Sequence, residues 1–211
     1  MKLRNSVFLI FIILLIDQFS KVYVKTNFVL DEDFFVLENF RIHFIENEGM
    51  AWGTVIPGEY GKLILTIFRI LAVIGIGYWL RDSIHKEKSN FLITAIALIF
   101  AGALGNIIDS VFYGVIFNDS LNQLATLFAK DNYGSLFHGK VVDMFYFPIW
   151  EGELPSWLPY WGGKYFRFFN AIFNVADFSI STGVGILIVF NKRAFTLPKD
   201  SMSRIFHDKL D

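Results

Sequence analysis

The chain of 211 residues contains no cysteine. A disulfide framework, a thiolate metal site and a cysteine nucleophile are therefore excluded. Charged residues are also scarce, at 18%, and the formal net charge is only −1. This balance gives no indication of a nucleic-acid partner or of an acidic tail. The chain also shows no internal repeat and no low-complexity tract.

Several reactive patterns are missing as well. None of the histidines lies in a long apolar stretch, and they lack metal-ligand spacing such as H-E-x-x-H; they are His43, His85, His138 and His207. There is no G-x-S-x-G motif and no obvious Ser–Lys pair to supply a nucleophile. Carboxylates therefore remain as the candidate reactive groups.

The chain is instead rich in apolar residues, with 54% hydrophobic residues and a mean hydropathy of +0.47. A soluble domain of this length needs more charge to cover its surface. Crossing a bilayer takes about 20 helical residues, and four apolar stretches are long enough, roughly 5–24, 62–80, 90–111 and 169–190. Since a backbone in lipid must satisfy its own hydrogen bonds, we predict an all-α polytopic membrane protein with four transmembrane helices.

The basic residues predict the orientation of these helices. They lie before the first stretch, between the second and third, and after the fourth: Lys2, Arg4, Arg81, Lys86, Lys88, Lys192 and Arg193. The positive-inside rule places these regions in the cytoplasm. We expect N-in/C-in topology, a single domain over 1–191, outer connections at 25–61 and 112–168, and a cytoplasmic tail at 192–211. The first stretch is expected to be a retained anchor, because Asp17 interrupts it and no small-x-small cleavage site follows.

The two outer connections differ in pattern. Alternating residues from Phe40 to Ile45, followed by turn signals, predict a small extracytoplasmic sheet in the first. The second contains a stretch rich in Trp, Tyr and Phe at about 145–169. Such residues favour the headgroup layer, so we expect an interfacial anchor rather than an aromatic ligand site.

Charged residues interrupt all four apolar stretches: Asp17, Lys21, Arg69, Asp109 and Asp177. Each costs about 2.5–3.5 kcal/mol on insertion scales, so each needs a reason. With a rise of about 1.5 Å per residue, all of them fall in the outer half of the membrane. Structural roles are open alternatives: Asp17 and Lys21 can neutralise each other at i, i+4. Asp109 can join helices together with Asn106, and Arg69 can snorkel or pair with an acid.

Asp143 lies in another apolar stretch, just before the aromatic segment. Two neighbouring carboxylates in a medium of low dielectric share a proton, which allows one to activate water and the other to protonate a carbonyl. This argument alone also permits a small proton- or cation-coupled transporter. Against that alternative, the chain has few helices and no inverted repeat. A structural scaffold would not need so many buried charges.

Five motifs occur in order along the chain. They are D-Q-x-x-K at 17–21, N-x-G-x-A-W-G at 47–53, G-A-x-G-N-x-x-D at 102–109, V-V-D at 141–143 and F-N-x-A-D at 173–177. In these motifs the chain resembles the lipoprotein signal peptidases (signal peptidase II) from about residue 10 to 190. Its form resembles that of the Bacteroidota-type members.

The resemblance implies an aspartic endopeptidase of the bacterial inner membrane with its active site toward the periplasm. Its substrate would be a diacylglyceryl-modified prolipoprotein, cut just before the lipidated Cys, without metal or cofactor. The fold would include a β-cradle and a periplasmic lid helix or loop. Asp143 and Asp177 match the catalytic pair. We also expect a monomer in contact with membrane lipids, and globomycin-type cyclic peptides as inhibitors.

Other residues take roles from the same resemblance. Asn106, Asp109 and Asn174 match positions that line or support the site, and Asp17 and Lys21 match a structural pair. The segment expected to hold the substrate contributes Asn47, Gly49 and Ala51.

The chain departs from the family pattern in two places. Ser110 replaces the arginine that follows G-N-x-x-D, and we hypothesise that Arg69 or Lys140 supplies the missing positive charge. The stretches 112–140 and 147–168 are longer than usual, which predicts an enlarged lid or altered access.

Overall fold

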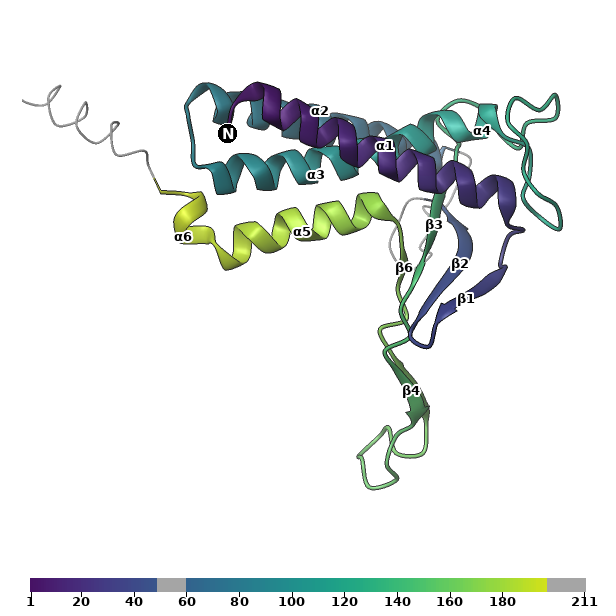
Figure 1. Ribbon diagram of the computed structural model, residues 1–211. Helices are drawn as coiled ribbons and strands as arrows, with labels where there is room; N and C mark the ends of the chain where they lie inside the picture. The colour runs from purple at the N-terminus through teal and green to yellow at the C-terminus, as the bar shows by residue number, and fades with distance from the viewer. Residues whose placement is uncertain (49–59, 197–211) are drawn as a thin grey trace, which may run out of the picture.

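The computed structural model describes residues 1–48 and 60–196. Its helical elements are α1 (Leu3–Asn27), α2 (Gly61–His85), α3 (Asn90–Ile108), the π-helical turn η2 (Asp109–Tyr113), α4 (Gly114–Ile116), α5 (Val175–Val189) and α6 (Asn191–Ala194). Its strands are β1 (Asp33–Leu37), β2 (Phe40–Asn47), β3 (Val141–Tyr146), β4 (Trp150–Glu153), β5 (Tyr165–Phe168) and β6 (Ile172–Phe173). The long helices lie side by side and the strands gather at one end of this bundle (Figure 1).

Among the described residues, three helical runs are long and apolar enough to cross a membrane: α1, α2 and the run Asn90–Ile116. α5 is apolar but has only 15 residues. The predicted count of four spans is therefore not confirmed. α5 begins at Val175 rather than at 169 because Ile172 and Phe173 pair with β3 and Asn174 caps the helix.

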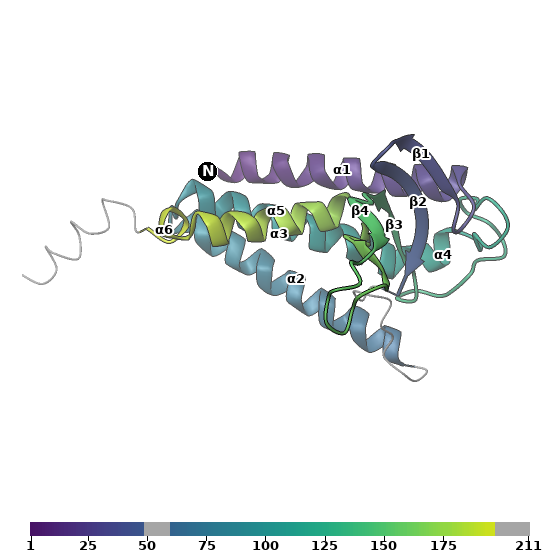
Figure 2. The same ribbon diagram turned by 90° about the horizontal axis from the view of Figure 1, so that it is seen from below.

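α3 is the central helix and packs against α1, α2 and α5. Viewed from below, α3 and α5 run between α1 and α2 (Figure 2). Two glycines allow this close packing. A Cβ on Gly102 would lie 2.2 Å from the carbonyl oxygen of Ala176, and a Cβ on Gly105 would lie 2.6 Å from the Asp17 carboxylate. Small residues of this kind let membrane helices approach closely.

The outer faces of the helices carry large apolar side chains that no other part of the described chain covers. They include Phe8, Phe11, Phe19, Phe68, Leu71, Ile74, Ile188 and Val189. Exposed apolar area of this extent marks a surface that contacts membrane. The interior, by contrast, contains fully buried charges such as Asp17 and Lys21.

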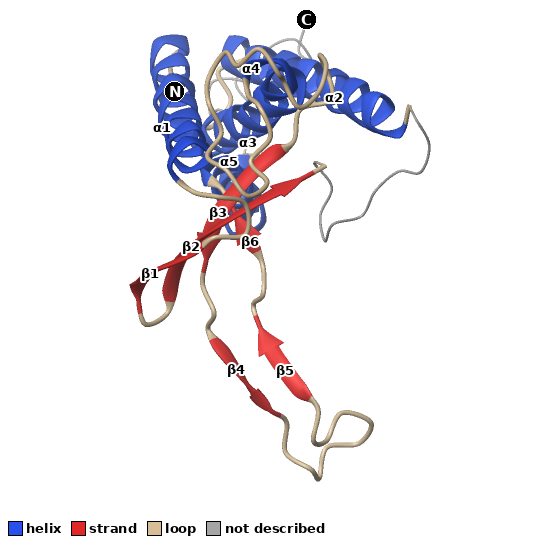
Figure 3. Cartoon of the chain, turned by 90° about the vertical axis from the view of Figure 1, so that its right-hand side faces the viewer, coloured by secondary structure: helices blue, strands red, loops and turns tan. Residues whose placement is uncertain are grey.

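The main sheet has the order β1-β2-β3-β6, and all its neighbours are antiparallel. It combines strands from both predicted outer connections, whereas the sequence predicted a sheet within the first. β3 lies between β2 and β6, and it is largely buried because its side chains pack with residues such as Val24 and Phe117. β4 and β5 form a separate two-stranded ribbon that continues outward from β3 and β6 (Figure 3).

These strands change the predicted fold class. The all-α class is not confirmed, since helices and a small sheet together build the molecule. The lid was expected as a helix or a loop, and residues 117–174 form strands, turns and loops without a helix. Residues 141–146 satisfy their backbone hydrogen-bonding groups by pairing with β2 and β6 in the sheet.

The segment 117–140 closes the strand-bearing end of the bundle. Ala125 N–H donates to the Lys25 carbonyl at 3.2 Å, and the Thr66 hydroxyl donates to the Phe137 carbonyl at 3.1 Å. Gly139 passes so close to η2 that a Cβ there would lie 2.0 Å from the Asp109 carbonyl oxygen. This segment therefore packs directly over the residues described next.

Candidate active site

The polar residues singled out in the sequence converge where α1, α3, β3 and the start of α5 meet. Asp143 lies on β3, and Asp177 lies in the first turn of α5. Asn106 comes from the end of α3, and Asp109 begins the π-helical turn. π-helical turns are frequent at functional sites.

The F-N-x-A-D motif forms a capping box at the start of α5. The Asn174 side-chain oxygen accepts from the Asp177 backbone N–H at 2.9 Å, and the Asp177 carboxylate accepts from the Asn174 N–H at 3.4 Å. Both satisfy backbone donors that the first turn of a helix leaves unpaired. The motif therefore determines where α5 begins and holds Asp177 there.

Asn174 also links Asp177 to the strand. Its side-chain amide donates to Asp143 Oδ1 at 2.7 Å and to the Val142 carbonyl at 3.1 Å. Asn106 completes the link, since its amide donates to Asp177 Oδ1 at 2.8 Å and its oxygen accepts from Asn174 at 3.1 Å. Two asparagines thus hold the two carboxylates on one hydrogen-bonded network.

The two carboxylates differ in environment. Asp143 is only 2% exposed, whereas Asp177 is partly open. Burial raises the pKa of Asp143 well above its usual range, and the charge of Asp177 raises it further. Lys21 and a hydrogen bond from Asn47 act in the opposite direction. Asp143 therefore keeps a proton at pH values where an ordinary aspartate is ionised.

Lys21 compensates the acids on the bundle side of the network. Its ammonium lies 2.9 Å from Asp17 and 2.8 Å from Asp109, and it donates to the Asn106 oxygen at 2.8 Å. Asp17 in turn accepts from the Ala176 backbone N–H at 2.8 Å. The first helix therefore stabilises the start of α5 directly, by satisfying one more donor of its first turn.

The candidate substrate-holding residues are placed only in part. Asn47 ends β2 and donates a hydrogen bond to the Asp143 carboxylate. Gly49 and Ala51 lie outside the described residues. Within the described ranges, no group of three His, Cys, Asp or Glu residues is arranged to hold a metal ion.

Comparisons with known proteins identify the family of the chain. Residues 9–192 match the model of the family described as signal peptidase (SPase) II. The chain belongs to the signal peptidase II family. It is 46% identical over 194 residues to a lipoprotein signal peptidase of Porphyromonas gingivalis, covering 91% of this chain and 84% of that protein. It is 37% identical over 186 residues to one of Amoebophilus asiaticus, covering 85% and 73%.

A solved structure described as a bacterial membrane enzyme is also similar in fold. It has a TM-score of 0.58 and 26% identity, and the match covers 89% of this chain and 92% of that one. The family model and the curated relatives are signal peptidases, and they give no support to the transporter alternative. The enzyme class predicted from the motifs, a membrane aspartic peptidase, is confirmed.

The structure separates the two cations considered as replacements for the family arginine. Arg69 of α2 donates to the Ser110 hydroxyl at 3.4 Å, and Asp177, Asp109 and Asp143 are the acids whose charges reach its guanidinium. Lys140 instead lies 3.6 Å from Glu46. Of the two, Arg69 is therefore the cation that faces the carboxylates in this signal peptidase II fold.

Sequence reasoning missed Gln18, although it lies inside the first motif. Its amide donates to Asp17 and Asp109, both at 3.0 Å, and its oxygen accepts from the Tyr113 hydroxyl at 3.2 Å. Its place beside Asp17 in an apolar helix was a usable signal, because a buried amide needs partners.

A second missed group is a buried ion pair behind the sheet. Lys25 pairs with Glu46 and donates to the Ser120 hydroxyl at 2.8 Å. Asp17, Lys21 and Lys25 follow one another at intervals of four, so all three lie on one face of α1. This spacing could have indicated that the buried stripe continues to Lys25.

Proposed function

We propose that this chain is a lipoprotein signal peptidase that cuts the signal peptide from diacylglyceryl-modified prolipoproteins, just before the lipidated Cys. The observation that carries the proposal is the network in which Asn174 and Asn106 hold Asp143 and Asp177 together. Family membership supports the reaction, and the geometry supports these two carboxylates as the groups that perform it.

Asp143 and Asp177 would divide the acid and base work. Asp177, the more open carboxylate, takes a proton from water as the water oxygen attacks the scissile carbonyl carbon. Asp143, whose pKa burial raises, donates its proton to the carbonyl oxygen. Asp177 then delivers its proton to the leaving nitrogen as the C–N bond breaks, and Asp143 regains one from the collapsing hydroxyl. The pair titrates jointly, so its apparent pKa values belong to both residues.

The surrounding polar groups would keep this pair in position. Lys21 offsets Asp17 and Asp109, which prevents two further negative charges from acting uncompensated on the catalytic pair. Asn47, together with Gly49 and Ala51, is proposed to hold the extended substrate. β2 supports this role, because Asn47 ends a strand of the sheet that carries Asp143.

Arg69 is proposed to take the place of the family arginine. Replacing it by Gln should lower the cleavage rate about 10- to 100-fold, because a charge-assisted hydrogen bond contributes about 1.5–3 kcal/mol. Arg69→Lys should recover part of the rate, and Lys140→Gln should change it little. The double variant Arg69→Ser/Ser110→Arg should also recover activity. Wild-type cleavage by Arg69→Gln would refute the assignment.

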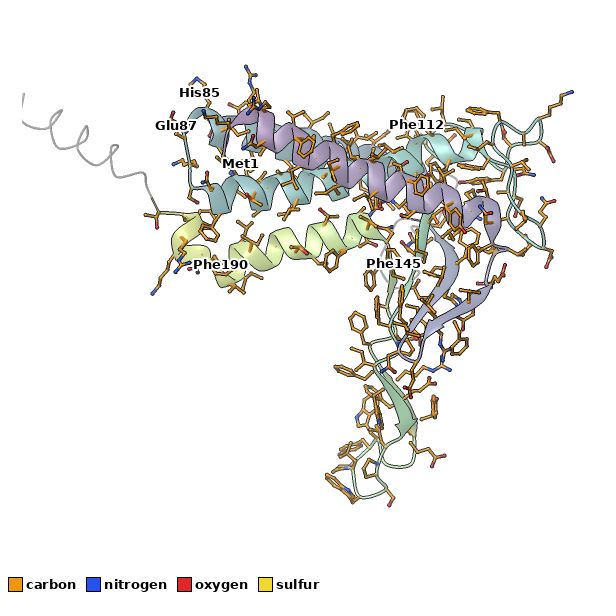
Figure 4. All side chains as sticks on the ribbon, viewed as in Figure 1. Met1, His85, Glu87, Phe112, Phe145 and Phe190 are labelled. Atoms are coloured by element: carbon orange, nitrogen blue, oxygen red, sulfur yellow. The ribbon has the colours of Figure 1, made fainter. Side chains whose placement is uncertain are left out.

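We further propose that the protein spans the bacterial inner membrane four times, with both termini in the cytoplasm and the site toward the periplasm. Met1, His85, Glu87 and Phe190 lie at one end of the bundle, and Phe145 and Phe112 lie toward the other (Figure 4). The Ser89 hydroxyl donates to the Ala194 carbonyl at 2.8 Å, which joins the link between α2 and α3 to α6. The basic stretches thus share one end, as cytoplasmic segments should.

α5 is the proposed fourth span despite its length. Its 15 residues cover about 22 Å at 1.5 Å per residue, less than a typical hydrocarbon layer. A short span is accommodated by local thinning of the bilayer and by flanking residues. We also propose that the enzyme acts as a monomer among membrane lipids, and that globomycin-type cyclic peptides occupy the site.

The decisive experiment is cleavage of a lipid-modified prolipoprotein in detergent by wild type, Asp143→Asn and Asp177→Asn. Loss of a general acid or base should lower the rate on the order of 10²–10⁴-fold. Asp131→Asn, at an exposed loop position, is the matched control and should cleave normally. Full activity in either active-site variant would overturn the mechanism.

A further inference from the structure

The ribbon formed by β4 and β5, here called the aromatic arm (residues 147–169), has two chemically distinct faces. Its register pairs Trp150 with Phe168 and Gly152 with Phe166, so these four residues share one face. The Trp150 and Phe166 rings lie 6.4 Å apart. This face is apolar, and its side chains stay open: Trp150 is 46% exposed, Phe166 38% and Phe168 54%.

The opposite face of the aromatic arm is polar. There the register pairs Glu151 with Arg167 and Glu153 with Tyr165. The Glu151 carboxylate lies 3.1 Å from Arg167, and the Arg167 guanidinium lies 5.7 Å from the Tyr165 ring. A ribbon with a charged face in water and an apolar face without a protein partner has the composition of an interfacial element.

The root of the aromatic arm is packed rather than loose. The Phe147 ring stacks on Phe40 of β2 at 4.7 Å and on Phe173 of β6 at 5.8 Å. Phe169 meets Phe173 at 6.4 Å. The arm therefore continues the strand that carries Asp143 and the strand that leads into Asp177, and its direction is set by aromatic contacts.

The direction of the aromatic arm relative to the helices indicates which surface its apolar face contacts. The long helices lie side by side, and the arm leaves sideways from the end where α5 begins (Figures 1 and 3). An element that extends sideways at the end of a membrane-crossing bundle runs along the bilayer surface. Trp and Tyr favour the headgroup layer, and the exposed tip contains Trp157, Tyr160 and Trp161.

We propose that the aromatic arm is a lipid-binding element whose Trp150, Phe166 and Phe168 face lies on the headgroup layer of the bilayer. Its polar face points to water. The aromatic arm connects β3 to β6. Its contact with lipid therefore holds the strands next to Asp143 and Asp177 at the membrane surface. The partner is the bilayer itself, which also contacts the apolar outer surface of the helices. The inference rests on the bundle crossing a membrane and not on the cleavage chemistry.

The absence of native cysteine allows a direct test with single spin labels. Phe166→Cys and Arg167→Cys are neighbours on opposite faces of the aromatic arm and form a matched pair. In vesicles of phosphatidylethanolamine and phosphatidylglycerol, the label at 166 should be more accessible to oxygen than to a water-soluble nickel chelate. The label at 167 should show the reverse. Equal access of the chelate to both positions would overturn the proposal.

Two further outcomes would also overturn it. Protection of the label at 166 from both reagents would mean that protein covers the apolar face. A spectrum at 166 that changes on dilution with unlabelled protein would identify that protein as a second copy. These readouts need no cleavage, so they remain valid if the proposed catalytic roles fail.

A functional readout complements the labels. Phe166→Ser/Phe168→Ser should raise KM several-fold in vesicles without changing kcat, and should have no effect in detergent. Glu151→Gln/Arg167→Gln is the control from the polar face and should leave KM unchanged. An equal effect of the first variant in vesicles and in detergent would contradict a role through the bilayer.

Discussion

The interior around Asp143 and the aromatic arm contain similar strands but opposite environments. In the interior, Asp17, Lys21 and Asp109 are fully buried and paired: the Lys21 ammonium lies 2.9 Å from Asp17 and 2.8 Å from Asp109. In the aromatic arm, large aromatic side chains are open. A soluble protein shows the reverse arrangement. The contrast teaches that membrane surroundings, not residue polarity alone, decide which groups this fold buries.

The largest expected effect comes from breaking the buried charge network. Lys21→Met leaves Asp17 and Asp109 buried without a cation, and loss of one partner from such a group costs about 3–5 kcal/mol. Thermal unfolding in detergent should show a large fall in Tm, and cleavage should be lost with it. Lys86→Met removes a cation paired at 2.8 Å with Asp82 on the exposed end of α2 and should change Tm little. Similar Tm values for the two variants would contradict the comparison.

A second prediction compares one residue type in the two regions. Phe44 of β2 is 0% exposed, whereas Phe168 of β5 is 54% exposed. Phe44→Ala should destabilise the protein by about 3–5 kcal/mol, because it leaves a cavity in a packed cluster. Phe168→Ala in detergent should stay within about 0.5 kcal/mol. The difference in Tm between the two variants is the measurement, and a loss of stability in Phe168→Ala as large as in Phe44→Ala would show that the arm is part of the core.

The smallest effect is a shift in the pH dependence of cleavage. The hydrogen bond from Asn47 stabilises the ionised form of Asp143 and so lowers its pKa, against the larger effect of burial. Asn47→Ala should raise that pKa further. The proton needed for catalysis then persists to higher pH, so the alkaline limb of the rate profile should move upward by up to about one pH unit.

Rate measurements across pH, with the exposed Asn132→Ala as control, test this sign. A shift of the alkaline limb toward lower pH would show that Asn47 stabilises the protonated carboxyl instead. An unchanged alkaline limb would show that Asn47 does not affect the pKa of Asp143.

Much of the interior could be predicted from the sequence, because charged residues are rare in apolar helices and therefore stand out. Charges in apolar helices need partners, and the spacing of Asp17 and Lys21 already places them on one face. The F-N-x-A-D motif contains its own capping box, so Asn174 and Asp177 carry their local geometry with them. The motif match then chose Asp143 from among several acids.

The aromatic arm could not be predicted in the same way. The run Tyr165–Phe168 was assigned to the outer connection 112–168, where its aromatic residues predicted an interfacial segment but gave no sign of a strand. Its pairing with Trp150–Glu153 is non-local, so no pattern within either stretch reveals it. The Lys25–Glu46 pair was missed for the same reason, because its members come from separate elements.

The register at the root of the aromatic arm has a consequence for how relatives can differ in length. Phe145 pairs with Phe173 and Tyr146 with Ile172. These two pairs separate the strand residues near Asp143 and Asp177 from the residues of the aromatic arm. Residues added or removed at the tip, around 155–163, leave these two pairs unchanged. The tip of the segment between Asp143 and Asp177 is thus free to lengthen, shorten or accept a foreign sequence while the strand pairing that positions the two carboxylates stays the same.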